Sequence, residues 1–82
     1  MTKNDIENNL KQILFERLDI KPEQVTLGTT LREGLGIDSF GTVEIIFEIK
    51  DKFGVLIKDE DARGIVKFSD LVDYVFKYLK KG

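Results

Sequence analysis

Apolar residues recur at helical spacing in three separate segments of the chain. Within residues 2–18, 39–53 and 69–79 they lie three or four positions apart, which places them on one face of an α-helix. Only residues 55–57 read as a strand, and an isolated strand has no partner for its backbone N–H and C=O groups. The pattern predicts an all-α fold: a small antiparallel bundle of three long helices with one short helix at 59–63.

Length and composition narrow the possible functions. The 82 residues are enough for one domain, 1–82, and they include no Cys, His or Trp. Thiolate nucleophiles, imidazole bases and the usual zinc ligands are therefore missing, and we expect no enzyme and no bound metal. Thirteen basic and fifteen acidic residues give a net charge of −2, which argues against nucleic acid. With no signal peptide and no long apolar run, we expect a cytoplasmic protein without a membrane span. We also expect it to be a monomer.

Turn and cap residues predict where the helices begin and end. Thr2 followed by Asp5 is typical of a capping box, Gly54 is placed to stop the second helix, and Ser69 is a candidate N-cap of the last. Residues 21–38 form a connection long enough to suggest a function. We expect its apolar residues to pin it to the core: Val25, Leu27, Leu31, Leu35 and Ile37.

The segment 39–53 is apolar around much of its girth, so we expect a central helix. Its apolar stripe is predicted at Val43, Ile46, Phe47 and Phe53, and Ile45 and Ile49 widen this stripe beyond an ordinary amphipathic face. The opposite, solvent-facing side is predicted to carry Glu44, Glu48 and Asp51, with Lys52 paired to Glu48.

Ser39 lies in the stretch LGIDSFGTVE, where a glycine-rich loop gives way to this helix. A catalytic serine needs a nearby base, and Ile37 stands where the nucleophile elbow has its first glycine, so hydrolase chemistry is disfavoured. Either Asp38 or Ser39 can cap the helix. If Asp38 is the cap, the Ser39 hydroxyl lies free in the first turn, where the helix dipole tolerates a phosphate ester.

A partial calcium-loop pattern begins at Asp59 and continues through Asp61, Gly64 and Asp70. Arg63 occupies a position that should help to bind the cation, which disfavours this interpretation.

Several motifs together resemble the acyl carrier protein family: GIDSFGTVE, an apolar helix ending in DKFGV, then IKDEDAR and FSDLVDYV. The resemblance covers nearly the whole chain. It implies a 4′-phosphopantetheine arm, transferred from coenzyme A to Ser39 by a phosphopantetheinyl transferase, with Asp38 as part of the flanking motif. The terminal thiol of the arm carries acyl groups as thioesters, so a chain without cysteine takes part in thiol chemistry without being an enzyme.

The resemblance also implies surfaces for partners and cargo. Acidic residues of the second helix meet basic patches on synthases, transferases or ligases, and the matching docking residues here are Phe40, Glu44, Glu48, Asp51, Asp59, Glu60 and Asp61. The interior between the helices shelters the acyl chain, and the candidates for its lining are Val43, Ile46, Phe47, Ile65 and Phe68. Bulky Phe40 and Phe47 are expected to shorten that pocket and favour a small or polar cargo.

Two residues depart from the fatty-acid carriers, which usually have leucine and then an acidic residue after the serine, in place of Phe40 and Gly41. We expect Gly41 to open the approach of a partner. DS-x-GTV is similar to the D-alanyl carrier proteins, whereas IKDEDAR resembles the fatty-acid type. The expected function is therefore a specialised carrier in fatty acid, related lipid or secondary-metabolite biosynthesis. An aminoacyl carrier and a cofactor-free helical interaction module are the alternatives.

Overall fold

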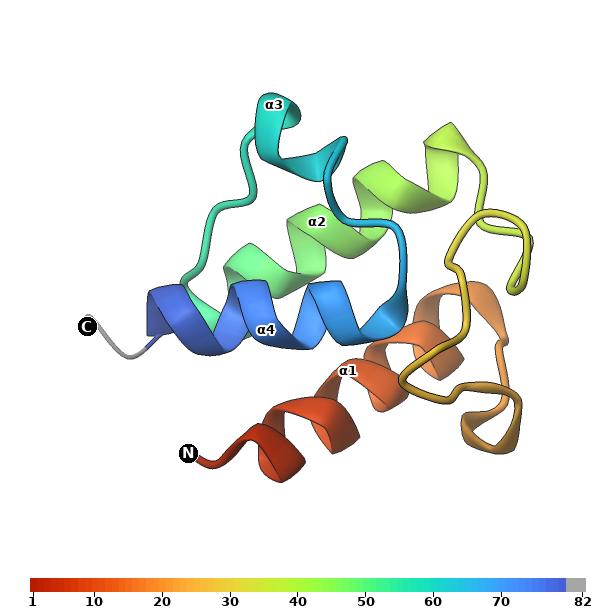
Figure 1. Cartoon of the computed structure of the whole chain (residues 1–82), viewed down its shortest axis with the longest axis horizontal. Helices are drawn as coiled ribbons and strands as arrows, with labels where there is room; N and C mark the ends of the chain where they lie inside the picture. Colours follow the sequence, from red (N-terminus) through yellow and green to blue (C-terminus); the bar gives the residue numbers. More distant parts are fainter. Residues whose placement is uncertain (80–82) are drawn as a thin grey trace.

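The structure is a computed structural model that describes residues 1–79, and helices joined by loops make up the fold (Figure 1). Its elements, in chain order, are α1 (Lys3–Leu18), a 3₁₀ turn η1 (Pro22–Gln24), α2 (Ser39–Phe53), α3 (Asp59–Ala62) and α4 (Phe68–Leu79). In Figure 1, α1 runs opposite to both α2 and α4. Within residues 1–79 no strand forms, and one isolated antiparallel bridge joins Thr30 to Lys67. The predicted all-α bundle of three long helices and one short helix is confirmed.

α1 is the central helix of the bundle, because it packs against both α2 and α4. Its predicted apolar face is buried, at Ile6, Leu10, Ile13 and Leu14. The predicted capping box is also present, since the Thr2 hydroxyl accepts from the Asp5 backbone N–H and the Asp5 carboxylate accepts from that of Thr2, each at 3.1 Å. The central place predicted for the second helix was therefore wrong.

α2 presents a different face to the core from the one that its sequence predicted. Its buried residues are Gly41, Ile45, Glu48 and Ile49. Val43 and Phe47, predicted to be buried, are 63% and 73% exposed. Two rows of this helix are apolar, and packing against α1 buries the row of Ile45 and Ile49. The helix ends as predicted, with Gly54 in the left-handed conformation at φ 71°.

The long connection between α1 and α2 is fastened to the segment that precedes α4. Val25 and Ile37 are buried as predicted, and Leu31 and Leu35 pack partly on the core, but Leu27 is exposed. Backbone hydrogen bonds of 2.9 Å run from Leu31 N to Val66 O, from Phe68 N to Thr29 O and from Ser69 N to Leu27 O.

These bonds change the start of the last helix. α4 begins at Phe68, so the prediction that Ser69 is its N-cap was wrong. The N–H groups of Phe68 and Ser69 donate to carbonyls of the connection, and no hydroxyl cap is needed for them. The Asp70 carboxylate accepts from the backbone N–H groups of Lys67 and Val66 at 3.0 and 3.1 Å.

Replacing Asp70 with alanine should lower the free energy of unfolding by about 1 kcal/mol near neutral pH, as loss of a helix cap does. The N–H donors of Lys67 and Val66 hold the pKa of Asp70 below its ordinary value of 3.8. The stabilisation that the Asp70 carboxylate provides is therefore fully present above pH 3.8, and it is lost as the pH falls through the lowered pKa. Urea unfolding at neutral pH and at a pH below the lowered pKa checks this prediction. Asp73→Ala, at an exposed position of α4, is the control. Equal losses of stability in the two variants at neutral pH would contradict the prediction.

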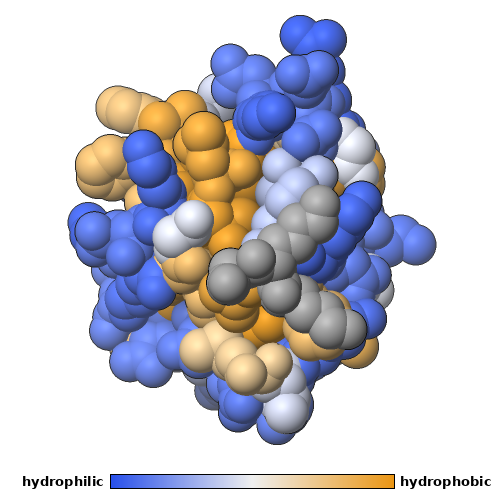
Figure 2. All heavy atoms as spheres, turned by 90° about the vertical axis from the view of Figure 1, so that its left-hand side faces the viewer, coloured by the Kyte–Doolittle hydropathy of each residue, from blue (hydrophilic) through white to orange (hydrophobic). Residues whose placement is uncertain are grey.

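The two ends of the bundle differ. α1 begins and α4 ends on the left of Figure 1, whereas α2 begins on the right. Figure 2 faces the left-hand end and shows a band of apolar side chains between hydrophilic margins. The start of α2, with Ser39, lies at the other end, beside the long connection.

Candidate functional site

Asp38 caps α2, and Ser39 is left free in the first turn. Asp38 Oδ1 accepts from the Gly41 backbone N–H at 2.8 Å, while the Asp38 carbonyl accepts from the Thr42 hydroxyl at 2.9 Å. The choice that the sequence left between Asp38 and Ser39 is thereby decided for Asp38. The Ser39 side chain is exposed, and Arg32 Nη2 lies 3.4 Å from its Oγ.

A cavity of about 610 Å³ lies beside Ser39, between α2, the long connection and the segment around α3. Much of its lining is aliphatic, including Leu14, Ile37, Ile45, Ile46, Ile57, Ile65 and Leu71. Arg32, Glu33 and Arg63 are exposed and also line it, so its rim is charged while its interior is apolar. Such a space can hold an alkyl chain that enters from the side of Ser39.

Two of the five predicted pocket residues, Ile46 and Ile65, line this cavity. The other three do not. Phe68 is fully buried in the core, and Val43 and Phe47 are directed to solvent. Phe40 is 81% exposed, so neither Phe40 nor Phe47 shortens the cavity, and that expectation was wrong. Sequence reasoning missed Ile45, Ile57 and Leu71 as lining residues; being apolar was their only signal.

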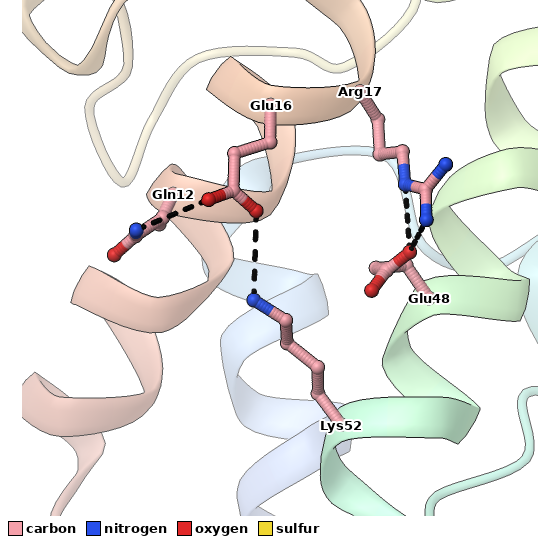
Figure 3. Close-up of polar contacts among 5 residues, drawn as sticks. All are labelled: Gln12, Glu16, Arg17, Glu48 and Lys52. Atoms are coloured by element: carbon pink, nitrogen blue, oxygen red, sulfur yellow. Dashed lines mark hydrogen bonds and ion pairs between the residues drawn. The ribbon is translucent and has the colours of Figure 1, made fainter.

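Glu48 is buried, not solvent-facing as predicted, with 8% of its surface exposed. Figure 3 shows Arg17 of α1 reaching it: Nε donates to Glu48 Oε2 at 2.7 Å, and Nη2 contacts the same oxygen. Lys52, predicted to pair with Glu48, instead lies 3.6 Å from Glu16 (Figure 3). The Glu48 carboxylate therefore fastens α2 to α1 and is not available as a surface charge.

The comparisons with known proteins agree with this geometry. Residues 8–75 match the model of the phosphopantetheine attachment site family. This chain belongs to that family. It is similar to an acyl carrier protein from Thermotoga maritima, whose crystal structure matches with a TM-score of 0.84 and 29% sequence identity, over 96% of this chain and 92% of that chain. The chain is therefore a carrier protein of the acyl carrier type that bears covalent 4′-phosphopantetheine and is not an enzyme.

Most of the predicted docking residues are on the surface of the carrier. Phe40, Glu44 and Asp51 are exposed on α2, and Asp59 and Glu60 are exposed on α3. With Glu48 buried, an apolar stripe of Phe40, Val43 and Phe47 occupies the outer side of α2 at spacings of three and four. The sequence assigned Val43 and Phe47 to the interior and so missed this stripe.

Asp61, the last of the predicted docking residues, is partly buried and has a partner inside the carrier. Tyr74 of α4 donates its hydroxyl proton to Asp61 Oδ2 at 2.7 Å. Burial, together with this hydrogen bond, raises the pKa of Tyr74 to about 12. The bond ties α3, only four residues long, to α4. Asp61 thus has a structural role, because it connects α3 to α4.

Gly41 is buried. The prediction that it opens the approach of a partner was therefore wrong. A Cβ at this position would lie 3.2 Å from the Ile37 Cγ2 atom and 3.3 Å from the Leu18 methyl groups. The glycine instead lets the first turn of α2 approach the end of α1, which positions Ser39.

Two carboxylates of the partial calcium-loop pattern have hydrogen-bond donors of their own. Asp61 accepts from Tyr74, and Asp70 accepts from the backbone of Val66 and Lys67. Among residues 1–79 no group of three or more His, Cys, Asp or Glu side chains is placed to hold a metal ion. No helix in the same range is long and apolar enough to cross a membrane.

Proposed function

We propose that Ser39 is the attachment residue of this carrier, and that the chain presents acyl thioesters to enzymes of fatty acid or related lipid or secondary-metabolite biosynthesis. The observation that carries the assignment is the exposed hydroxyl of Ser39 in the first turn of α2, which takes no part in capping the helix. Because Asp38 provides the cap, esterification of Ser39 removes no hydrogen bond that the helix needs.

The surroundings of Ser39 suit a phosphodiester. The positive end of the α2 dipole and the Arg32 guanidinium both favour an anion at Oγ. A transferase forms the bond from Oγ to phosphorus as the phosphoanhydride bond of coenzyme A breaks; adenosine 3′,5′-bisphosphate is the leaving group, and a base of the transferase takes the serine proton. When bound, the arm supplies a terminal thiol that holds the acyl group as a thioester.

The cavity supports an aliphatic cargo. Its lining residues Ile46, Ile57 and Ile65 present no hydrogen-bonding side-chain atoms, so an alkyl chain is favoured there by burial, at roughly 0.8 kcal/mol for each CH₂ removed from water. Thr30 and Thr42 also line the cavity, and a small polar aminoacyl group would find few partners apart from their hydroxyls and the charged rim. The cavity thus favours an acyl cargo.

Partner enzymes are proposed to dock on the outer side of α2. This docking surface consists of Phe40, Val43 and Phe47, with Glu44 and Asp51 beside them. Exposed aromatic side chains next to carboxylates suit a partner with an apolar pocket rimmed by basic residues. The charges would increase the rate of encounter more than the affinity, so association would weaken with salt. A cytoplasmic location and a monomeric state stay predictions from the sequence.

Intact mass measurement tests the attachment residue. Incubation with coenzyme A and a broad-specificity phosphopantetheinyl transferase should add one arm to the wild type and none to Ser39→Ala. Ser69→Ala is the matched control, because it removes the other serine of the chain and should accept the arm at the rate of the wild type. Melting curves should show Ser39→Ala folded, with a stability within about 0.5 kcal/mol of the wild type. An unmodified wild type, or an equally modified Ser39→Ala, would refute the assignment.

A further inference from the structure

Hydrogen bonds of neighbouring residues hold the backbone that carries Arg32 at the rim of the cavity. The Leu31 N–H donates to Val66 O at 2.9 Å, and the Ile37 N–H donates to Leu31 O at 3.1 Å. The Gly34 N–H donates to the Thr30 hydroxyl at 2.8 Å. The backbone is thus fixed on both sides of Arg32, whose guanidinium extends to Ser39.

Within residues 1–79 no carboxylate forms an ion pair with this guanidinium. Its one polar side-chain partner there is the Ser39 hydroxyl, at 3.4 Å, and Arg32 forms no ion pair with Glu33 or Asp38. A neutral hydroxyl at this distance accepts at most one weak hydrogen bond and does not neutralise the positive charge of the guanidinium. An anion with two or more oxygens, bonded to the same Oγ, would meet its planar set of N–H donors.

We propose that Arg32 binds the phosphodiester of the arm and so directs the first part of the arm along the cavity rim. This inference rests on the attachment at Ser39 proposed above. Arg32 and Ser39 both line the cavity, so a phosphodiester held between them lies at its entrance. The pair keeps the root of the arm next to the cavity, and a partner that draws the arm out must break it. Arg32 is accordingly a positioning residue.

Phosphorus NMR of the arm-bearing protein tests the proposal, with intact mass as a prior check that each variant carries the arm. In the wild type, the phosphodiester resonance should shift as salt is raised to about 1 M, where ion pairs are screened. In Arg32→Gln it should already lie at the high-salt position and stay there. Arg32→Lys should lie between the two, because an ammonium keeps the charge but loses the planar donor set.

A second readout compares melting temperatures with and without the arm. The increase in melting temperature on attachment should be smaller in Arg32→Gln than in the wild type by about 2–5 °C. Arg63→Gln is the matched control, since it removes the same charge from the same cavity rim without a contact to Ser39. It should behave as the wild type in both measurements.

Identical phosphorus shifts and melting increments in Arg32→Gln and wild type would overturn the proposal. Equal changes in Arg32→Gln and Arg63→Gln would also overturn it, because the two readouts would then depend only on the net charge of the cavity rim. A wild-type resonance that ignores salt would overturn it without any variant. If mass measurement finds no arm on the wild type, the attachment proposal itself fails, and that result differs from each of these.

Discussion

Replacing Phe68 with alanine should lower the free energy of unfolding by about 3–5 kcal/mol. Phe68 is 0% exposed and is among the largest fully buried side chains of the described chain. It is the first residue of α4, and its backbone N–H donates to Thr29 O, so the helix cannot easily move inward to fill the space. In a domain of this size the loss is a large part of the total stability.

Phe47→Ala is the matched control, because it removes the same side chain from a position that is 73% exposed. Its stability should stay within about 0.5 kcal/mol of the wild type in chemical unfolding. Its transferase reaction, however, should show a KM raised roughly tenfold, as loss of an exposed aromatic anchor costs about 1–2 kcal/mol at an interface. Comparable destabilisation by the two substitutions would mean that the outer face of α2 is assigned wrongly.

This pair of phenylalanines marks the limit of what helical periodicity predicts. The spacing of apolar residues located α2 within its observed bounds, but Ile45 and Ile49 repeat as regularly as Val43 and Phe47. Which row faces inward depends on α1, whose Leu18 meets the Gly41 face of α2. A sequence pattern describes one helix at a time, so it could not choose between two apolar rows.

The helix ends show the same division between local and distant causes. Thr2, Asp38 and Gly54 act on backbone groups within a few residues, so the sequence predicted Thr2 and Gly54 and narrowed the cap of α2 to Asp38 or Ser39. The start of α4 depends on the carbonyls of Leu27 and Thr29, about forty residues earlier, and no local pattern reveals them.

The candidate site divides in the same way. The neighbouring residues restricted Ser39 to the cap or the first turn of α2, and the motif resemblance supplied the chemistry proposed for it. The cavity beside it combines Leu14, Ile57 and Leu71 from three distant segments, so its lining emerged only with the fold. Arg32 lies at the rim because of the path of the long connection. The apolar residues of this connection show no regular spacing, so the sequence could not predict that path.

Replacing Arg17 with methionine should lower the free energy of unfolding by about 2–3 kcal/mol. The substitution leaves the Glu48 carboxylate buried between α1 and α2 without its cation, while methionine keeps much of the side-chain volume. Breaking a fully buried ion pair costs about 3–5 kcal/mol. The Arg17 side chain is 51% exposed, so water partly replaces its donors and the expected cost is smaller.

Lys52→Met is the control, since it breaks the 3.6 Å contact between Lys52 and Glu16, an exposed pair whose loss should cost less than about 1 kcal/mol. Adding Glu48→Leu to Arg17→Met should restore most of the lost stability, because the double variant leaves no unpaired charge between the helices. Urea unfolding of the three variants measures all of these changes. If Arg17→Met costs no more than Lys52→Met, the carboxylate is solvated, and Glu48 returns to the acidic face that its sequence position suggested.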